Sequence, residues 1–93
     1  MAQNTTLTLD AGVWGEITNS DVTNVTFQNL SHYPIYVQAT TGSAPTTEDG
    51  SVEYGPTEGE RNVALTDLFP GVTDAVRVWV TSEGEATVFV SHA

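Results

Sequence analysis

Residues Val76–His92 have the sequence VRVWVTSEGEATVFVSH, with two apolar runs in which valines occupy every second position. This period-two alternation is typical of β-strands and differs from the 3.6-residue period of an amphipathic helix. The polar segment Ser82–Glu85 between the two runs has the composition of a turn. The stretch therefore predicts a closing β-hairpin. One face of this hairpin would carry Val76, Val78, Val80, Val88 and Val90.

The reverse face of the predicted hairpin would carry two large aromatic side chains, Trp79 and Phe89. Either a second sheet of the same domain covers them, or they face a partner. Both alternatives stay open at this point. Leu7 and Leu9 join them as candidates for a contact surface, because the segment Ala2–Leu7 is suited to adding an edge strand to a neighbouring molecule.

The same alternation recurs along the whole chain, together with frequent turn signals and many β-branched residues. The predicted strands lie near residues 5–9, 13–18, 22–30, 34–40, 51–54, 62–66, 75–81 and 86–91. The only helical segment we expect is a single turn at Thr66–Phe69, ahead of Pro70 and Gly71. Residues 1–93 therefore predict one all-β domain, a small β-sandwich or jelly-roll-like fold of about eight short strands.

Residues 41–61 contain much of the glycine, proline and acid of the chain. Asp49 and Gly50 form a hairpin-turn signal between two polar arms. Long loops in compact domains often carry function. A solvated connection between two sheets explains this composition equally well.

The charge of the chain excludes several classes of partner. Twelve acids stand against two bases, Arg61 and Arg77, and the formal net charge is −10. Such a protein repels phosphates, so we expect no binding to DNA or RNA. No stretch approaches the roughly 20 apolar residues of a membrane-spanning helix, so we expect no membrane partner. Met1–Thr6 lacks the basic and apolar regions of a secretory signal, so we expect folding in a cytoplasm.

No pattern of reactive side chains predicts catalysis, a cofactor or a metal. Cysteine is absent, and no nucleophile elbow, phosphate-binding loop or zinc-binding helix motif occurs. His32 and His92 lie far apart in the sequence and lack further ligands. The acids match no ordered calcium loop. A carboxylate pair for glycoside hydrolysis is compatible with the composition, but so small a domain has little room for a substrate cleft.

Two stretches carry a family resemblance. They are Val22–Thr40, VTNVTFQNLSHYPIYVQAT, and Val76–His92, quoted above. With the glycine-rich loop after the first stretch, they resemble small virion proteins of tailed bacteriophages and related gene-transfer particles. The resemblance implies a non-enzymatic β-domain attached to the outside of a capsid, as a decoration protein or the base of a head fibre. It transfers no individual site residue.

The partners implied by this resemblance are the major capsid protein or other virion subunits, in a multi-copy assembly or homo-oligomer within a virion assembled in the host cytoplasm. High negative charge suits a protein that must stay soluble at high copy number. The alternative is a carbohydrate- or surface-binding module. Its sugar-stacking platform would use the aromatic residues Trp14, Tyr33, Tyr36 and Tyr54.

Overall fold

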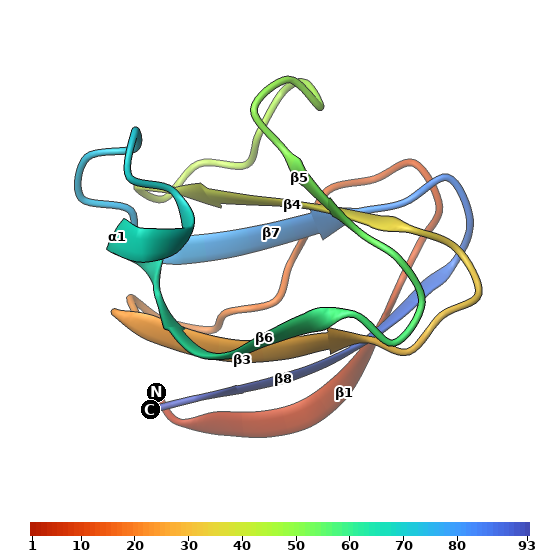
Figure 1. Cartoon of the computed structure of the whole chain (residues 1–93), viewed down its shortest axis with the longest axis horizontal. Helices are drawn as coiled ribbons and strands as arrows, with labels where there is room; N and C mark the ends of the chain where they lie inside the picture. Colours follow the sequence, from red (N-terminus) through yellow and green to blue (C-terminus); the bar gives the residue numbers. More distant parts are fainter.

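A computed structural model describes all 93 residues as a sandwich of two four-stranded antiparallel sheets (Figure 1). Sheet 1 has the order β1-β8-β3-β6, and sheet 2 has the order β2-β7-β4-β5. The strands of sheet 1 are β1 (Gln3–Leu9), β8 (Ala86–His92), β3 (Asn24–Asn29) and β6 (Gly59–Ala64). Those of sheet 2 are β2 (Gly15–Glu16), β7 (Arg77–Thr81), β4 (Ile35–Thr40) and β5 (Val52–Tyr54). The predicted all-β sandwich is confirmed.

The core lies between the two sheets and consists of 16 buried apolar residues. Because side chains alternate across a strand, each sheet sends every second residue inward. Sheet 1 contributes Val25, Phe27, Ala86, Val88 and Val90, and sheet 2 contributes Ile35, Val37, Ala39, Tyr54, Val78 and Val80. The single helical turn α1 (Leu65–Leu68) places Leu65 over one end of this core.

The predicted closing hairpin is wrong, although both of its strands are present. Strand β7 pairs with β4 and β2, whereas β8 pairs with β1 and β3. The segment Ser82–Glu85 therefore crosses from one sheet to the other, and the valines of the two strands face each other across the core. Alternation specifies which face of a strand is buried, and both arrangements bury the same valines, so the pattern could not distinguish them.

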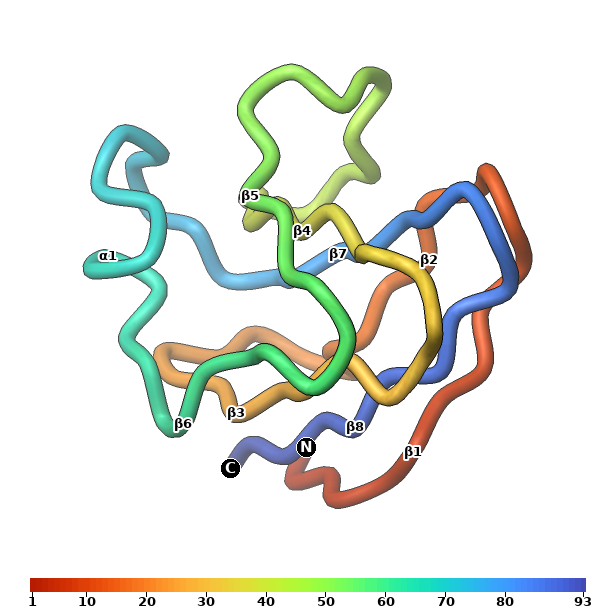
Figure 2. The backbone as a smooth tube through the Cα atoms, turned by 45° about the vertical axis from the view of Figure 1, so that its right-hand side comes forward, coloured from red at the N-terminus to blue at the C-terminus, as the bar shows by residue number.

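The other differences from the sequence prediction are shifts of strand ends. Strand β6 ends at Ala64, and α1 follows at Leu65, so the strand predicted at residues 62–66 begins earlier and stops sooner. Strand β2 is reduced to two residues. Residues 41–61 contain β5 and the start of β6, and the segment before β5 projects from sheet 2 (Figure 2). Gln38 holds this projection, because its Nε2 donates to the carbonyl oxygen of Thr47 at 2.7 Å.

A buried amide links the two sheets at one end of the sandwich. Asn29, the last residue of β3, is fully buried. Its Nδ2 donates to the carbonyl oxygens of Tyr33 at 2.8 Å and Tyr54 at 3.1 Å. Its Oδ1 accepts from the backbone nitrogen of Ser31 at 2.9 Å and from the Ser31 hydroxyl. A sheet 1 residue thereby satisfies backbone groups of the β3–β4 turn and of β5 in sheet 2.

We predict that Asn29→Ala lowers the free energy of unfolding by about 3 kcal/mol, because it leaves buried carbonyl groups without donors. Urea unfolding monitored by tryptophan fluorescence measures the loss. Asn24→Ala is the matched control. Asn24 donates a single side-chain bond to the carbonyl oxygen of Asn62 at an exposed position, so its loss should be about 0.5 kcal/mol. Equal losses in the two variants would refute the structural role of Asn29.

Candidate binding face

The outer face of sheet 1 is the most distinctive surface of the molecule. Phe89 lies at its centre, paired in register with Thr6 on β1 and with Gln28 on β3. The strand neighbours of Phe89, Val88 and Val90, are fully buried, so Phe89 itself points outward. Hydroxyl and amide side chains surround it. We call this surface the acid-free face, and define it by Asn4, Thr6, Thr8, Thr26, Gln28, Arg61, Thr87, Phe89 and Ser91.

No carboxylate belongs to this face in a protein with twelve acids. The four strands of sheet 1 contain one acid, Glu60, which is paired in register with the inward-facing Phe27. The remaining acids lie on loops, on α1 and on sheet 2. The face does carry Arg61, which forms no ion pair, whereas Arg77 on the outer side of sheet 2 bridges Glu16 at 3.0 Å and Asp21 at 2.8 Å. The surface potential is therefore strongly asymmetric between the two sheets.

A shallow groove of about 320 Å³ crosses this face beside Phe89. Gly59, which is paired with Gln28, forms part of its wall. A Cβ at Gly59 would lie 2.0 Å from the carbonyl oxygen of Phe27, so the close approach of β6 to β3 requires glycine here. The residues lining the groove are Thr26, Phe27, Gln28, Thr57, Gly59, Glu60, Arg61 and Phe89.

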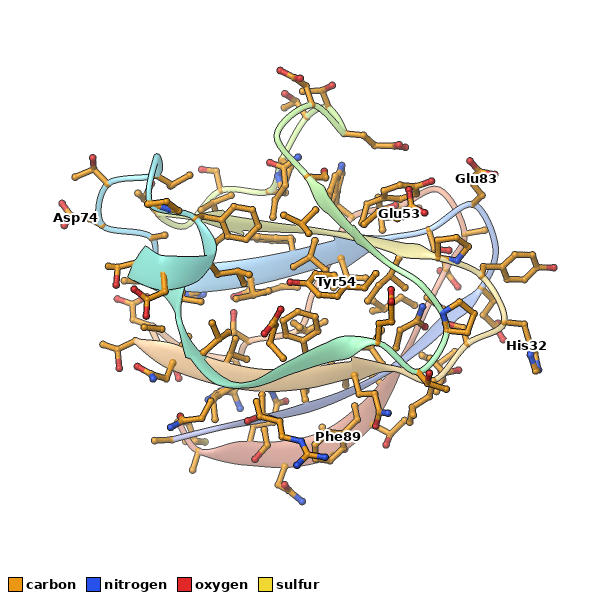
Figure 3. All side chains as sticks on the ribbon, in the orientation of Figure 1. His32, Glu53, Tyr54, Asp74, Glu83 and Phe89 are labelled. Atoms are coloured by element: carbon orange, nitrogen blue, oxygen red, sulfur yellow. The ribbon has the colours of Figure 1, made fainter.

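Glu60 is turned away from the face by a bond to the core. The hydroxyl of Tyr54 donates to Oε2 of Glu60 at 3.1 Å. The Tyr54 ring, labelled in Figure 3, packs edge-on against Phe27, and the two ring centroids are 5.0 Å apart. Burial raises the pKa of the Tyr54 phenol far above its ordinary value, and the bond to Glu60 raises this pKa further. The phenol is therefore held protonated as a donor, and the carboxylate stays anchored at the rim of the groove.

The four residues predicted for a contact surface do not share one surface. Phe89 lies on the acid-free face. Trp79 lies on the outer side of sheet 2, half-buried, with its Nε1 donating to Oγ1 of Thr40 at 3.0 Å. Leu7 and Leu9 point inward from β1 and pack against the core.

The aromatic residues considered for a sugar platform are also separated. Tyr54 is buried in the core, and Tyr36 lies on the outer side of sheet 2 opposite Thr81. Tyr33 is exposed at the β3–β4 turn, where its ring lies against Gly84. These three tyrosines therefore share no surface, and Trp14 lies half-buried just before β2.

The histidines do not meet either. His32 is exposed on the β3–β4 turn (Figure 3), and His92 is buried at the end of β8, where its Nε2 lies 3.2 Å from Nε2 of Gln3. No group of three or more histidine, cysteine or acidic side chains is arranged to hold a metal ion. The structure contains no helix with the length and hydrophobicity that a membrane crossing requires.

Comparisons with protein-family models, with curated proteins and with solved structures find no match to this chain.

We predict that stability falls at alkaline pH and that Tyr54 is a main cause. An unfolded tyrosine ionises near pH 10.0, whereas the folded state raises this pKa. The stabilisation from Tyr54 is therefore complete below pH 10.0 and is lost as pH rises above it, by up to about 1.4 kcal/mol for each pH unit. Urea unfolding between about pH 8 and pH 11 measures the slope.

Tyr54→Phe should flatten this slope, and Tyr33→Phe, at an exposed position, is the matched control that should keep it. A part of the slope should remain in Tyr54→Phe, because the pKa of Tyr36 is also raised, first by desolvation and then by Glu53. An unchanged slope in Tyr54→Phe would contradict the environment described for this residue.

Proposed function

We propose that this chain is a non-enzymatic structural protein of a phage-like particle, attached to the outside of the capsid as a decoration or head-fibre-base subunit. The observation that supports this proposal is the acid-free face. The sequence resemblance suggests the class of particle, and the face offers a surface through which one subunit can attach to a shell. Major capsid protein or other virion subunits are the proposed partners.

Electrostatics favour this face over the rest of the surface as the point of attachment. A docked surface loses water, and buried carboxylates without partners carry a desolvation penalty of several kcal/mol each. The loops and the outer side of sheet 2 would bring such carboxylates into the contact. The acid-free face instead offers Phe89 as an apolar anchor within a ring of hydroxyl and amide groups, which can exchange water for hydrogen bonds to a partner.

The remaining acids suit the same role. A particle coat is crowded with identical copies and encloses packaged nucleic acid. With ten net negative charges, copies that are not attached repel each other and are repelled by phosphates. Attachment through a neutral patch then gives a preferred orientation, with the acids facing solvent.

A second candidate function, carbohydrate binding, is favoured by the groove beside Phe89. An aromatic ring next to amide, hydroxyl and guanidinium donors is a typical combination for stacking on and hydrogen bonding to a sugar. Gln28 is already held in place, since its Nε2 donates to the carbonyl oxygen of Thr57 at 3.0 Å. A glycan array probed with the purified protein tests this candidate, and Phe89→Ala should abolish any signal that arises from the groove.

We predict that the chain co-sediments with particles released by cells that carry its gene, and that added protease removes it from intact particles. Density-gradient fractions probed with an antibody to the purified protein measure this. Phe89→Ala should weaken rebinding to particles stripped of the protein by about tenfold or more, because a central aromatic anchor is lost. Absence of the chain from particle fractions would refute the proposal.

A pair of variants with matched charge separates the face from general electrostatics. Arg61→Ala and Thr73→Glu each make the formal charge of −10 more negative by one. Arg61 lies on the acid-free face, whereas Thr73 is exposed on the loop between α1 and β7. Only Arg61→Ala should weaken rebinding. Equal weakening in both would show that net charge, and not this face, controls attachment.

A further inference from the structure

The sandwich has four sheet edges, and three of them are unsuited to pairing with another strand. On sheet 2, β2 has two residues and β5 has three, and both carry an acid. On sheet 1, β6 is irregular, with a register shift opposite Val25–Phe27 and a positive φ of 48° at Asn62. Short strands, charges and bulges are the features that protect natural edges from pairing.

The fourth edge, β1, has none of these protections. It is seven residues long and pairs with β8 without a register shift over its whole length. Its sequence, QNTTLTL, contains no charge and no proline. Asn4, Thr5, Thr6 and Thr8 are exposed, and no backbone hydrogen bond from another segment covers them.

The backbone groups on the open side of β1 can be identified from β8. Leu30 donates its backbone N–H to the carbonyl oxygen of Thr87 at 2.8 Å, so the backbone of Thr87 points toward β3. The N–H and C=O groups of successive residues point to opposite sides of a strand, so those of Val88, and of every second residue from it, point toward β1. The residues paired with them on β1, such as Leu7, use their backbone groups in hydrogen bonds to β8. The free N–H and C=O groups on the open edge belong to Asn4, Thr6 and Thr8.

We propose that β1 is a homodimerisation edge, at which two copies of this chain join their first sheets into one continuous antiparallel sheet. With a twofold axis at Thr6, Thr6 pairs with its own copy and Asn4 pairs with Thr8 of the second copy. This register uses every free backbone group on the edge. It also places hydroxyl and amide side chains opposite each other on the same face, where threonine pairs are favourable.

The charge distribution leaves β1 as the edge at which two copies of the chain can meet, although their net charges repel each other at longer range. Two bodies of charge −10 can approach closely only where neither presents a carboxylate. The first acid beyond β1 is Asp10. In the proposed register the two Asp10 residues lie at opposite ends of the paired strands, roughly 27 Å apart, which exceeds the Debye length of about 10 Å at 0.1 M salt.

The dimer would also affect attachment to a particle, and only this consequence rests on the proposed function. Figure 1, viewed along the shortest axis, shows the two sheets edge-on. The whole molecule measures 30 by 18 Å in this plane, so one acid-free face covers at most about 540 Å², against about 800 Å² per partner in a standard interface. Side-by-side pairing at β1 places two acid-free faces on the same side of one sheet and doubles this area.

Analytical ultracentrifugation of the purified full chain tests the edge directly. We expect a dimer whose fraction rises with concentration between about 1 μM and 1 mM. Thr6→Lys places two like charges opposite each other at the twofold axis and should weaken dimerisation by about tenfold or more. Thr73→Lys is the control with the same change in net charge. It should dimerise at least as well as the wild type, because the overall repulsion is reduced.

A cysteine pair tests the register, since the chain has no native cysteine. In a hydrogen-bonded antiparallel pair the Cα atoms are about 5.5 Å apart, within the range for a disulfide. Under mild oxidation, Thr6→Cys should therefore form a covalent dimer. Thr8→Cys should not, because the two copies of residue 8 lie roughly 13 Å apart in this register. Cross-linking of Thr8→Cys, or of both variants equally, would refute the proposed register.

A wild-type chain that is monomeric up to about 1 mM, or a Thr6→Lys variant that dimerises as well as Thr73→Lys, would overturn the dimerisation edge. Neither result bears on whether the chain is found in particles. Conversely, a dimer that forms at β1 but is absent from particle fractions would refute the proposed function and leave the edge intact.

Discussion

The side chain of Asn29 is the contact through which the two sheets depend on each other. It lies at the end of β3, is fully buried, and bonds to the turn that leads into β4 and to β5. The hydroxyl of Ser31 continues the network by accepting the backbone N–H of Thr87 on β8 at 3.2 Å. Because apolar burial is non-directional, valines alone do not set how one sheet is placed over the other. Directional bonds at this end fix that placement, and β3, β8 and β6 then form the central part of the acid-free face.

The class of fold could be predicted from the sequence because period-two alternation reports directly on burial. The strand partners could not be predicted in the same way. Val78 and Val88 bury equally well side by side or face to face, and the decision lies in contacts distant in sequence. One of these is the bond from the Ser82 hydroxyl to the carbonyl oxygen of Pro34 at 2.8 Å, which holds the segment Ser82–Glu85 as it crosses between the sheets. No local sequence pattern predicts such a bond.

The candidate face was partly visible in the sequence. The alternation in residues 86–91 identifies Phe89 as an aromatic residue in need of cover, but the predicted hairpin wrongly places Trp79 on the same face. The segments 5–9, 22–30 and 86–91 contain no acid, but the segments 34–40 and 75–81 of sheet 2 contain none either, so the absence of acids alone did not identify the face. Recognising that these segments form one sheet required the topology. The groove over Gly59 could not be predicted, because the contact of that glycine with the carbonyl group of Phe27 depends on an irregular pairing of β3 and β6.

Charge and edge structure together limit how copies of this chain can associate. If both edges of sheet 1 were open, head-to-tail pairing would add copies without end and produce a filament. The irregular β6 edge, with its register shift and the positive φ at Asn62, prevents this. Pairing at β1 is isologous and consumes the only open edge, so it closes at two copies. The acids on loops and on sheet 2 then keep separate pairs apart, and the acid-free surface stays free for a larger partner.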